Sequence, residues 1–231
     1  QKSKKKIIFI VLIKFLLPKL KFHVTSQQEK NDVENLSKNW KITICPNQVG
    51  FKINKTITNK TRTILAIGRH EPQKGFDILI KNFIKFNETN SNTILLKIIG
   101  VEGSETKALK TLASGSKNIE FIDNIDRDKI KYELSNCLAL FSTSRYENFG
   151  NTIFEALSCG TLVIMPNHLP WNQARDFTHQ YNLKKDSLLD ILVDLKKIIF
   201  KHRFQVNKQI IFVEKMKIKT KKRHIKLFNK L

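Results

Sequence analysis

Between residues 63 and 165, short apolar runs alternate with segments whose apolar residues recur at helical spacing. The strand-like runs are 63–68, 93–99, 119–122, 138–142 and 161–165. One of the helical stripes consists of Phe76, Leu79, Ile80, Phe83 and Ile84. Strands that alternate with helices favour a parallel sheet with right-handed crossovers. We therefore predict an α/β fold built on a doubly wound parallel sheet, with its chemistry in the loops at the carboxyl ends of the strands.

The segments on either side of this region predict further elements. Residues 19–24 form a strand-like run, and the capping signal at 25–29 precedes a helix that should reach about Trp40. A second short strand is predicted over 41–45. From Lys184 to the end of the sequence, the apolar spacing is helical, so we expect C-terminal helices.

An interrupted apolar run near the start of the sequence follows Lys4, Lys5 and Lys6 and ends at Pro18. A membrane span needs about 20 apolar residues. A signal peptide needs a small-residue cleavage site, and none follows this run. We expect a buried or amphipathic helix here.

The positive charge is large but unevenly placed. The formal charge is +22, from 42 basic and 20 acidic residues, and 35 of the basic residues are Lys. Base and phosphate recognition favours the planar fork of Arg, which occurs only 7 times. The stretch from Tyr132 to Leu183 contains no Lys, so the positive charge lies on the flanks, at 2–21 and 201–230. We expect no nucleic-acid partner; an anionic membrane surface under a flank and a plain solvated face both stay open.

The cysteines suggest a compartment. Cys45, Cys137 and Cys159 are odd in number and form no Cys-x-x-Cys motif. A disulfide scaffold is therefore disfavoured and a reducing environment fits. We expect a cytoplasmic protein, with a peripheral position on the inner face of the membrane as the other location.

The first loop that could carry chemistry is Gly68–Phe76, between a strand and a helix. Glycine allows close backbone approach, while Arg69 and Lys74 bring two cations beside a helix N-terminus that favours anions. This arrangement suits a diphosphate, although an ordinary turn with solvated cations would contain the same residues. The spacing excludes the Gly-x-x-x-x-Gly-Lys-Ser/Thr loop of many nucleoside-triphosphate-binding proteins.

The second loop, residues 142–152, leads from a strand into a helix that we expect Asn151 or Thr152 to cap. Glu147 lies in the loop and Glu155 in the first turns of the helix, with backbone N–H groups of the turn between them. Carboxylates accept hydrogen bonds from sugar hydroxyls, and backbone N–H groups cradle phosphate. The combination suits a nucleotide-sugar; two solvated carboxylates are the alternative.

Taken together, these motifs resemble those of group 1 glycosyltransferases, the retaining family 4 type with the GT-B fold. Glu147 and Glu155 match the Glu-x7-Glu pair of that family, and 68–76 matches its Gly-Arg … Lys-Gly-Phe phosphate loop. Gly100 matches its strand–Gly turn. The resemblance covers about residues 22–175. It implies a Rossmann-like sheet of the kind found in the C-terminal domain of GT-B enzymes.

The resemblance also implies roles for individual residues. Glu147, Arg69 and Lys74 would be the catalytic residues: the two cations hold the donor diphosphate, and Glu147 contacts the donor sugar. Glu155 would bond the ribose hydroxyls. The other implied donor-binding residues are Gly68, Phe149, Gly150, Asn151, Thr152 and, near the base, Ile122.

Three positions depart from the family pattern. Leu162 stands where the family usually has Pro, His168 where it has Gly, and the amide Asn172 where it has an acid. Pro170 and Trp171 agree with the pattern. The donor sugar is therefore left open, and His168 either touches the ligand or has a structural role.

The resemblance divides the chain into three predicted segments. Residues 1–60 would be a remnant of the N-terminal acceptor domain and hinge, 61–183 the nucleotide-sugar-binding domain, and 184–231 a basic helical tail. Because the family places a whole acceptor domain before the phosphate loop, the activity of this chain alone is uncertain.

The overall expectation is the donor-binding domain of a retaining, hexosyltransferase-like glycosyltransferase. It would use a UDP- or GDP-linked sugar and transfer it to a glycan or lipid acceptor in polysaccharide biosynthesis. No metal-ligand spacing is visible in the sequence, so we expect a metal-independent reaction without a cofactor. The alternatives are a catalytically inactive nucleotide-binding remnant and a basic nucleic-acid-binding domain.

Overall fold

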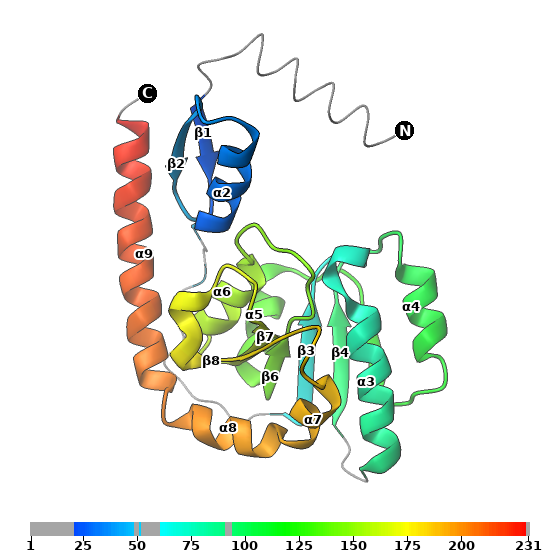
Figure 1. Ribbon diagram of the computed structural model, residues 1–231. Coiled ribbons are helices and arrows are strands. Elements are labelled where there is room, and N and C mark those ends of the chain that lie inside the picture. Colours follow the sequence, from blue (N-terminus) through cyan, green and yellow to red (C-terminus); the bar gives the residue numbers. More distant parts are fainter. Residues whose placement is uncertain (1–20, 49–50, 52–60, 91–93, 230–231) are drawn as a thin grey trace, which may run out of the picture. The chain divides into compact units, whose positions relative to one another are not determined.

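A computed structural model of the chain describes residues 21–48, 51, 61–90 and 94–229 (Figure 1). The described residues fall into two units, a smaller one with 21–48 and 218–229 and a larger one within 51–217. The helix expected before Pro18 lies outside the described residues. The boundaries of the three segments predicted from the sequence, after residues 60 and 183, stay predictions.

The larger unit is built on a six-stranded sheet whose neighbouring strands are all parallel. Its strands are β3 (Thr63–Ile67), β4 (Leu95–Ile99), β5 (Ile119–Ile122), β6 (Ala139–Phe141), β7 (Leu162–Pro166) and β8 (Thr178–Tyr181). They lie side by side in the order β5-β4-β3-β6-β7-β8. The predicted doubly wound parallel sheet is confirmed.

Helices cover both faces of this sheet (Figure 1). They are α3 (Phe76–Thr89), α4 (Thr106–Ala113), α5 (Arg127–Asn136), α6 (Asn151–Ser158), α7 (Leu188–Val193), α8 (Leu195–Arg203) and α9 (Val206–Phe228), with 3₁₀ turns η1 (Pro72–Lys74) and η2 (Asn172–Phe177). None of the helices in the described part of the chain is long and apolar enough to cross a membrane.

The apolar strands explain why the sheet is covered on both sides. Successive strand residues point to opposite faces, so Ile64 and Ala66 pack into the core beneath α3, α4 and α7. Leu65 and Ile67 pack into the other core, with residues of α5, α6 and the first part of α9. A strand buried on both faces is apolar along its whole length, which is why β3 is recognisable in the sequence as an unbroken run.

The strand order creates a switch point between β3 and β6. The chain moves outward from β3 through β4 to β5, then returns to place β6 on the other side of β3 and continues to β7 and β8. Ligands of open α/β sheets bind in the crevice outside the carboxyl ends of the strands at such a point. The loops after β3 and β6, which are the two loops singled out in the sequence, meet there.

The smaller unit contains a parallel pair of strands, β1 (Lys21–Val24) and β2 (Lys41–Ile44), and the helix α2 (Gln27–Leu36) between them. The Ser26 side chain accepts a hydrogen bond from the Glu29 N–H group, as the capping signal predicts. The expectation that this helix reaches Trp40 is wrong. The helix ends at Leu36, and Trp40 is instead buried against Phe22, with ring centroids 4.8 Å apart.

Candidate functional site

Two charged side chains from different loops meet at the switch point. Lys74, at the end of η1, places its Nζ 2.6 Å from Oε1 of Glu147, in the loop after β6. The hydroxyl of Ser144 donates to the same carboxylate oxygen at 2.8 Å. Only 17% of the Lys74 side chain and 12% of the Glu147 side chain are exposed. The sequence predicted both residues for the site, but not that they form an ion pair.

A set of polar contacts holds the two loops together. The Arg145 guanidinium lies 3.2 Å from Asp77 at the start of α3, and it also donates to the Pro72 carbonyl. The backbone N–H of Arg145 donates to the Gln73 carbonyl at 2.8 Å. The Thr143 hydroxyl donates to the Lys74 carbonyl at 3.1 Å. These bonds fix Lys74 and Glu147 relative to each other, and the sequence analysis assigned no role to Arg145 or Thr143.

Gly75 allows the close approach of the two loops. It has a φ of 64°, in the left-handed region, and connects η1 to α3. A Cβ atom at this position would lie 2.3 Å from the Thr143 carbonyl oxygen. Any other residue would therefore be strained in its backbone and would also push the loop after β6 away.

Glu155 projects from the second turn of α6 and is largely buried. Its side chain is 14% exposed, and its Oε1 lies 3.5 Å from Nη2 of Arg127, at the start of α5. Burial raises the pKa of the Glu155 carboxyl above its ordinary value, and the positive charge of Arg127 partly opposes this rise. The carboxylate is thus held in a poorly solvated place with one cation nearby, so a donor that offers hydroxyl groups would gain from binding it.

The start of α6 differs from the expectation. The N-cap is Gly150, with a φ of 79°, and Asn151 begins the helix, so the prediction that Asn151 or Thr152 caps it is wrong. A Cβ atom at Gly150 would lie 3.0 Å from the indole Nε1 of Trp171. The helix therefore begins directly after a tight turn, and the Gly150 carbonyl accepts hydrogen bonds from the N–H groups of Ile153 at 3.0 Å and Phe154 at 3.2 Å.

Phe149 supports this turn from beneath. Its side chain is buried, and its ring centroid lies 5.2 Å from that of Trp171, which is completely buried. The Trp171 indole N–H donates to the Phe149 carbonyl at 2.5 Å. In the sequence, Trp171 was noted only as a match to a family pattern. In the structure, Trp171 contacts both the side chain and the carbonyl of Phe149 and so orients the N-terminus of α6.

The loop after β3 contributes the remaining predicted residues. The Gly68 N–H donates to the Ile99 carbonyl at 2.9 Å, and the Arg69 side chain is exposed. A Cβ atom at Gly100 would lie 2.0 Å from the Gly68 carbonyl oxygen, so the ends of β3 and β4 touch through their backbones. The Ile122 carbonyl accepts from the Gly100 N–H at 3.0 Å, which places Ile122 at the same carboxyl edge of the sheet.

The family model described as "Glycosyl transferases group 1" matches residues 48–172, more than half of the chain. The chain belongs to the group 1 glycosyl transferase family.

Individual relatives are more distant. Mannosylfructose-phosphate synthase from Agrobacterium fabrum is 30% identical over 116 residues, which is 46% of this chain and 26% of that protein. A mutant of S. aureus TarM, solved in complex with UDP among other ligands, has a TM-score of 0.72 at 18% identity, over 99% of this chain and 47% of TarM. Anabaena HepE, solved with UDP and glucose, has a TM-score of 0.73 at 14% identity, over 90% of this chain and 63% of HepE.

These structures show that the larger unit has the Rossmann-like fold of GT-B glycosyltransferases. The chain spans about a quarter of the length of the curated relative and about half to two-thirds of the two solved structures.

Two histidines in the loops of this family member have structural contacts. The His168 Nε2 donates to the Arg145 carbonyl at 3.1 Å and so helps to hold the loop after β6. His70, to which the sequence analysis assigned no role, is 1% exposed, with its Nδ1 3.1 Å from the Thr106 hydroxyl. Its Nε2 has no hydrogen-bond partner among the described residues. Burial lowers the pKa of His70, and the charge of Lys110 lowers it further.

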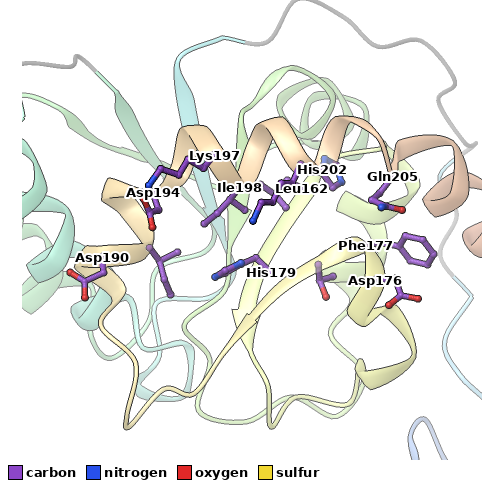
Figure 2. A pocket seen from close by; sticks show the side chains of 13 residues that line it. Leu162, Asp176, Phe177, His179, Asp190, Asp194, Lys197, Ile198, His202 and Gln205 are labelled. Carbon is purple, nitrogen blue, oxygen red and sulfur yellow. Dashed lines mark hydrogen bonds and ion pairs between the residues drawn. The ribbon is translucent and has the colours of Figure 1, made fainter.

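Two cavities lie at the opposite end of the sheet from the switch point. One, of about 460 Å³, is lined by residues at the starts of β7 and β8 and by α8, including His179 and Asp194 (Figure 2). The other, of about 690 Å³, is lined by residues that precede β3, β4 and β6 and by α8. Both lie at the amino ends of the strands, so neither belongs to the switch point. Within the described ranges, no group of three or more His, Cys, Asp and Glu side chains could hold a metal ion.

Proposed function

We propose that the larger unit binds a nucleotide-sugar at the β3–β6 switch point and belongs to a retaining enzyme that transfers the sugar to a glycan or lipid acceptor. The observation that carries this proposal is the meeting of Lys74 and Glu147 across the two loops at 2.6 Å, beside the N-terminus of α6. A cation, a carboxylate and a helix start at the carboxyl ends of β3 and β6 match the diphosphate and hydroxyl groups of such a donor.

In this proposal each charged group has a different role in binding the donor. Arg69, Lys74 and the first turn of α6 hold the diphosphate and stabilise the negative charge that develops on it as the sugar leaves. Glu155 accepts hydrogen bonds from the ribose hydroxyls, and Glu147 contacts the sugar once the diphosphate has drawn Lys74 away. Phe149, Gly150, Asn151 and Thr152 shape the turn, and Gly68 and Ile122 line the edge of the sheet toward the base.

The relatives support a UDP-linked donor as the first candidate. TarM, the pneumococcal O-GlcNAc transferase GtfA and HepE have all been solved with UDP. We further propose a metal-independent reaction in polysaccharide biosynthesis and a cytoplasmic location, which would keep Cys45, Cys137 and Cys159 reduced, as they are in the structure.

A ligand panel tests the donor site directly. Saturation-transfer NMR and thermal shift would be measured for UDP, GDP, ADP and their sugar conjugates. We expect one diphosphate to raise the melting temperature in a concentration-dependent way, because it binds only the folded state. Lys74→Ala should abolish the shift, while Lys85→Ala, an exposed position on α3, should leave it unchanged. No shift for any nucleotide at millimolar concentration would refute the donor-site proposal.

Transfer is a separate question from binding. A radiolabelled donor, chosen from the panel, would be incubated with the chain and with lipid or oligosaccharide acceptors. Product with retained anomeric configuration would support the enzymatic proposal. Tight donor binding without transfer or donor hydrolysis, in this chain and in any longer protein that contains it, would favour the inactive nucleotide-binding alternative.

A further inference from the structure

The outer face of α8 exposes two phenylalanines in contact with each other. Phe200 is 60% exposed and Phe204, which follows the last residue of the helix, is 70% exposed. Their ring centroids are 5.3 Å apart. Large aromatic side chains are normally buried, and an exposed apolar cluster marks a surface that meets another molecule.

Cations flank this aromatic pair on both sides. At about 100° per residue, Leu195 points into the core and Phe200 and Phe204 point outward, with Lys196 and Arg203 on one side and Lys197 and Lys201 on the other. The cavities agree with this arrangement. Lys196, Phe200 and Arg203 line the 690 Å³ cavity. Lys201 and Lys197, which is labelled in Figure 2, line the 460 Å³ cavity. All four cationic side chains are exposed.

Acidic groups gather along one edge of this face, because Asp176, Asp190 and Asp194 line the same 460 Å³ cavity as Lys197 and Lys201. Asp194, whose Oδ1 lies 2.7 Å from Lys197 Nζ, is the one acidic residue from 193 to 208, a segment with five Lys and Arg residues. The face is therefore apolar along its centre and positive along the edge of Lys196 and Arg203, where the described residues that line the 690 Å³ cavity include no acid. An anionic phospholipid membrane has apolar chains beneath a layer of negative phosphates, so it is complementary to both the phenylalanine pair and the cations.

We propose that the outer face of α8 docks on an anionic phospholipid membrane. Phe200 and Phe204 enter the headgroup layer, and Lys196, Lys201 and Arg203 lie against the lipid phosphates. Because α8 lies at the amino ends of the strands, opposite the β3–β6 switch point, docking leaves the candidate donor site open. The proposal does not depend on the proposed function.

Vesicle binding by the full chain tests this proposal. Sedimentation would compare phosphatidylcholine vesicles with vesicles that contain about one-third phosphatidylglycerol, at low and high salt. We expect binding to the anionic vesicles alone, weakened by salt. Phe200→Ser with Phe204→Ser should weaken binding by about tenfold or more, because two apolar groups no longer enter the lipid. Lys196→Gln with Arg203→Gln should weaken it by about fivefold for each cation removed.

Matched controls keep the result specific to α8. Lys184→Gln with Lys185→Gln removes the same charge from an exposed loop, and Tyr132→Ser removes an aromatic ring that is 67% exposed on α5. Both should bind vesicles like the unaltered chain. Circular dichroism and melting temperature would verify that each variant folds, and a thermal shift with nucleotide would report the switch point separately.

Three results would overturn the proposal. The chain could fail to bind anionic vesicles. It could bind them equally well after both phenylalanines are replaced, which would place the contact elsewhere, for instance in the Lys-rich residues 2–21. Finally, sedimentation velocity could show a dimer that the Phe200 and Phe204 substitutions dissociate while vesicles have no effect, which would make a second copy of the chain the occupant of this face.

Discussion

Lys74 Nζ and Glu147 Oε1 lie 2.6 Å apart, although the two residues are 73 positions apart in the sequence. The two groups that a nucleotide-sugar would need, a cation for the diphosphate and a carboxylate for the sugar, neutralise each other in the described structure. A diphosphate must therefore compete with Glu147 for the Lys74 ammonium group. Removing the Glu147 carboxylate should therefore strengthen diphosphate binding, whereas removing the Lys74 ammonium group should weaken it.

Replacing each partner in turn should reveal this competition. Glu147→Gln should bind UDP more tightly than the unaltered chain, because the ammonium group is no longer held by a carboxylate. Lys74→Met should weaken UDP binding by about tenfold or more and cost about 1–3 kcal/mol of unfolding free energy, because a mostly buried carboxylate loses its cation. Isothermal calorimetry and denaturant unfolding provide the two measurements.

The double variant is the control for this ion pair. Lys74→Met with Glu147→Gln should recover part of the stability lost in Lys74→Met alone, with a coupling of about 0.5–3 kcal/mol. Additive unfolding free energies, or weaker UDP binding in Glu147→Gln, would show that the two side chains do not constrain each other in solution.

Glu155→Gln should separate stability from binding. Burial raises the pKa of Glu155, so its ionised form costs stability in the folded state. This cost is fully present above the raised pKa and disappears as the pH falls toward the ordinary value for a glutamate. We therefore expect Glu155→Gln to raise the melting temperature at neutral pH, with a gain that shrinks at acidic pH.

The same variant should bind UDP less well. The loss of charge-assisted hydrogen bonds to the ribose should cost about 1.5–3 kcal/mol of binding free energy. Glu88→Gln, at an exposed position on α3, should change neither quantity. Unchanged calorimetric affinity in Glu155→Gln would exclude a ribose contact, and a lower melting temperature would contradict the effect of burial.

Gly75→Ala should disrupt the approach of the two loops. The new Cβ atom would lie 2.3 Å from the Thr143 carbonyl oxygen at a φ of 64°, so the loop after β6 must move. We expect a loss of about 1–3 kcal/mol of unfolding free energy, together with weaker nucleotide binding. Gly115→Ala is the matched control, since a Cβ atom there has no neighbour within 4 Å. Equal stability of the two variants in urea would contradict the role given to Gly75.

His70 should make the fold sensitive to acid. Because burial lowers its pKa, the unfolded chain takes up a proton near the ordinary value of about 6.5 while the folded chain does not. Stability is therefore present above this pH and lost as the pH falls toward the lowered folded value. His70→Leu should change the unfolding free energy at pH 7.5 by about 1 kcal/mol or less, because it removes both a hydrogen bond and the unpartnered Nε2.

The test is the difference in unfolding free energy between pH 7.5 and pH 5.5. It should be smaller for His70→Leu than for the unaltered chain. Identical differences would mean that the His70 imidazole takes up a proton within the folded state, against its buried position beside Phe76 and Phe121.

The sequence predicted strands β3 to β7 but missed the edge strand β8. Strands β3, β6 and β7 are continuous apolar runs because helices cover both of their faces, whereas β4 and β5 each contain one charged residue, Lys97 and Glu120. The edge strand β8, with the sequence Thr-His-Gln-Tyr, has one buried residue and no apolar pattern, and it was not predicted. Helix α5 was also missed, because Leu134 and Ser135 are its only buried residues among those described, so its sequence lacks an apolar stripe.

The sequence marked residues of the candidate site but not the contacts between them. The motifs identified Lys74, Gly75 and Glu147 because the type and order of these residues are visible in the sequence itself. The Lys74–Glu147 ion pair and the bonds of Arg145 depend on β6 lying beside β3, which no local pattern specifies. The support of Phe149 by Trp171 depends in the same way on packing between distant segments.

The pairing of Ile64 with Ala139 has a consequence for how the chain folds. Strands β3, β4 and β5 are neighbours both in the sequence and in the sheet, so this half can form through short loops. The β3–β6 contact instead closes a long loop, whose described residues contain two strands and three α-helices. Closing this loop costs chain entropy before the contact between the strands contributes any stabilisation. The candidate donor site therefore forms only when the two half-sheets join, and the proposed binding of UDP should first appear at that stage of refolding.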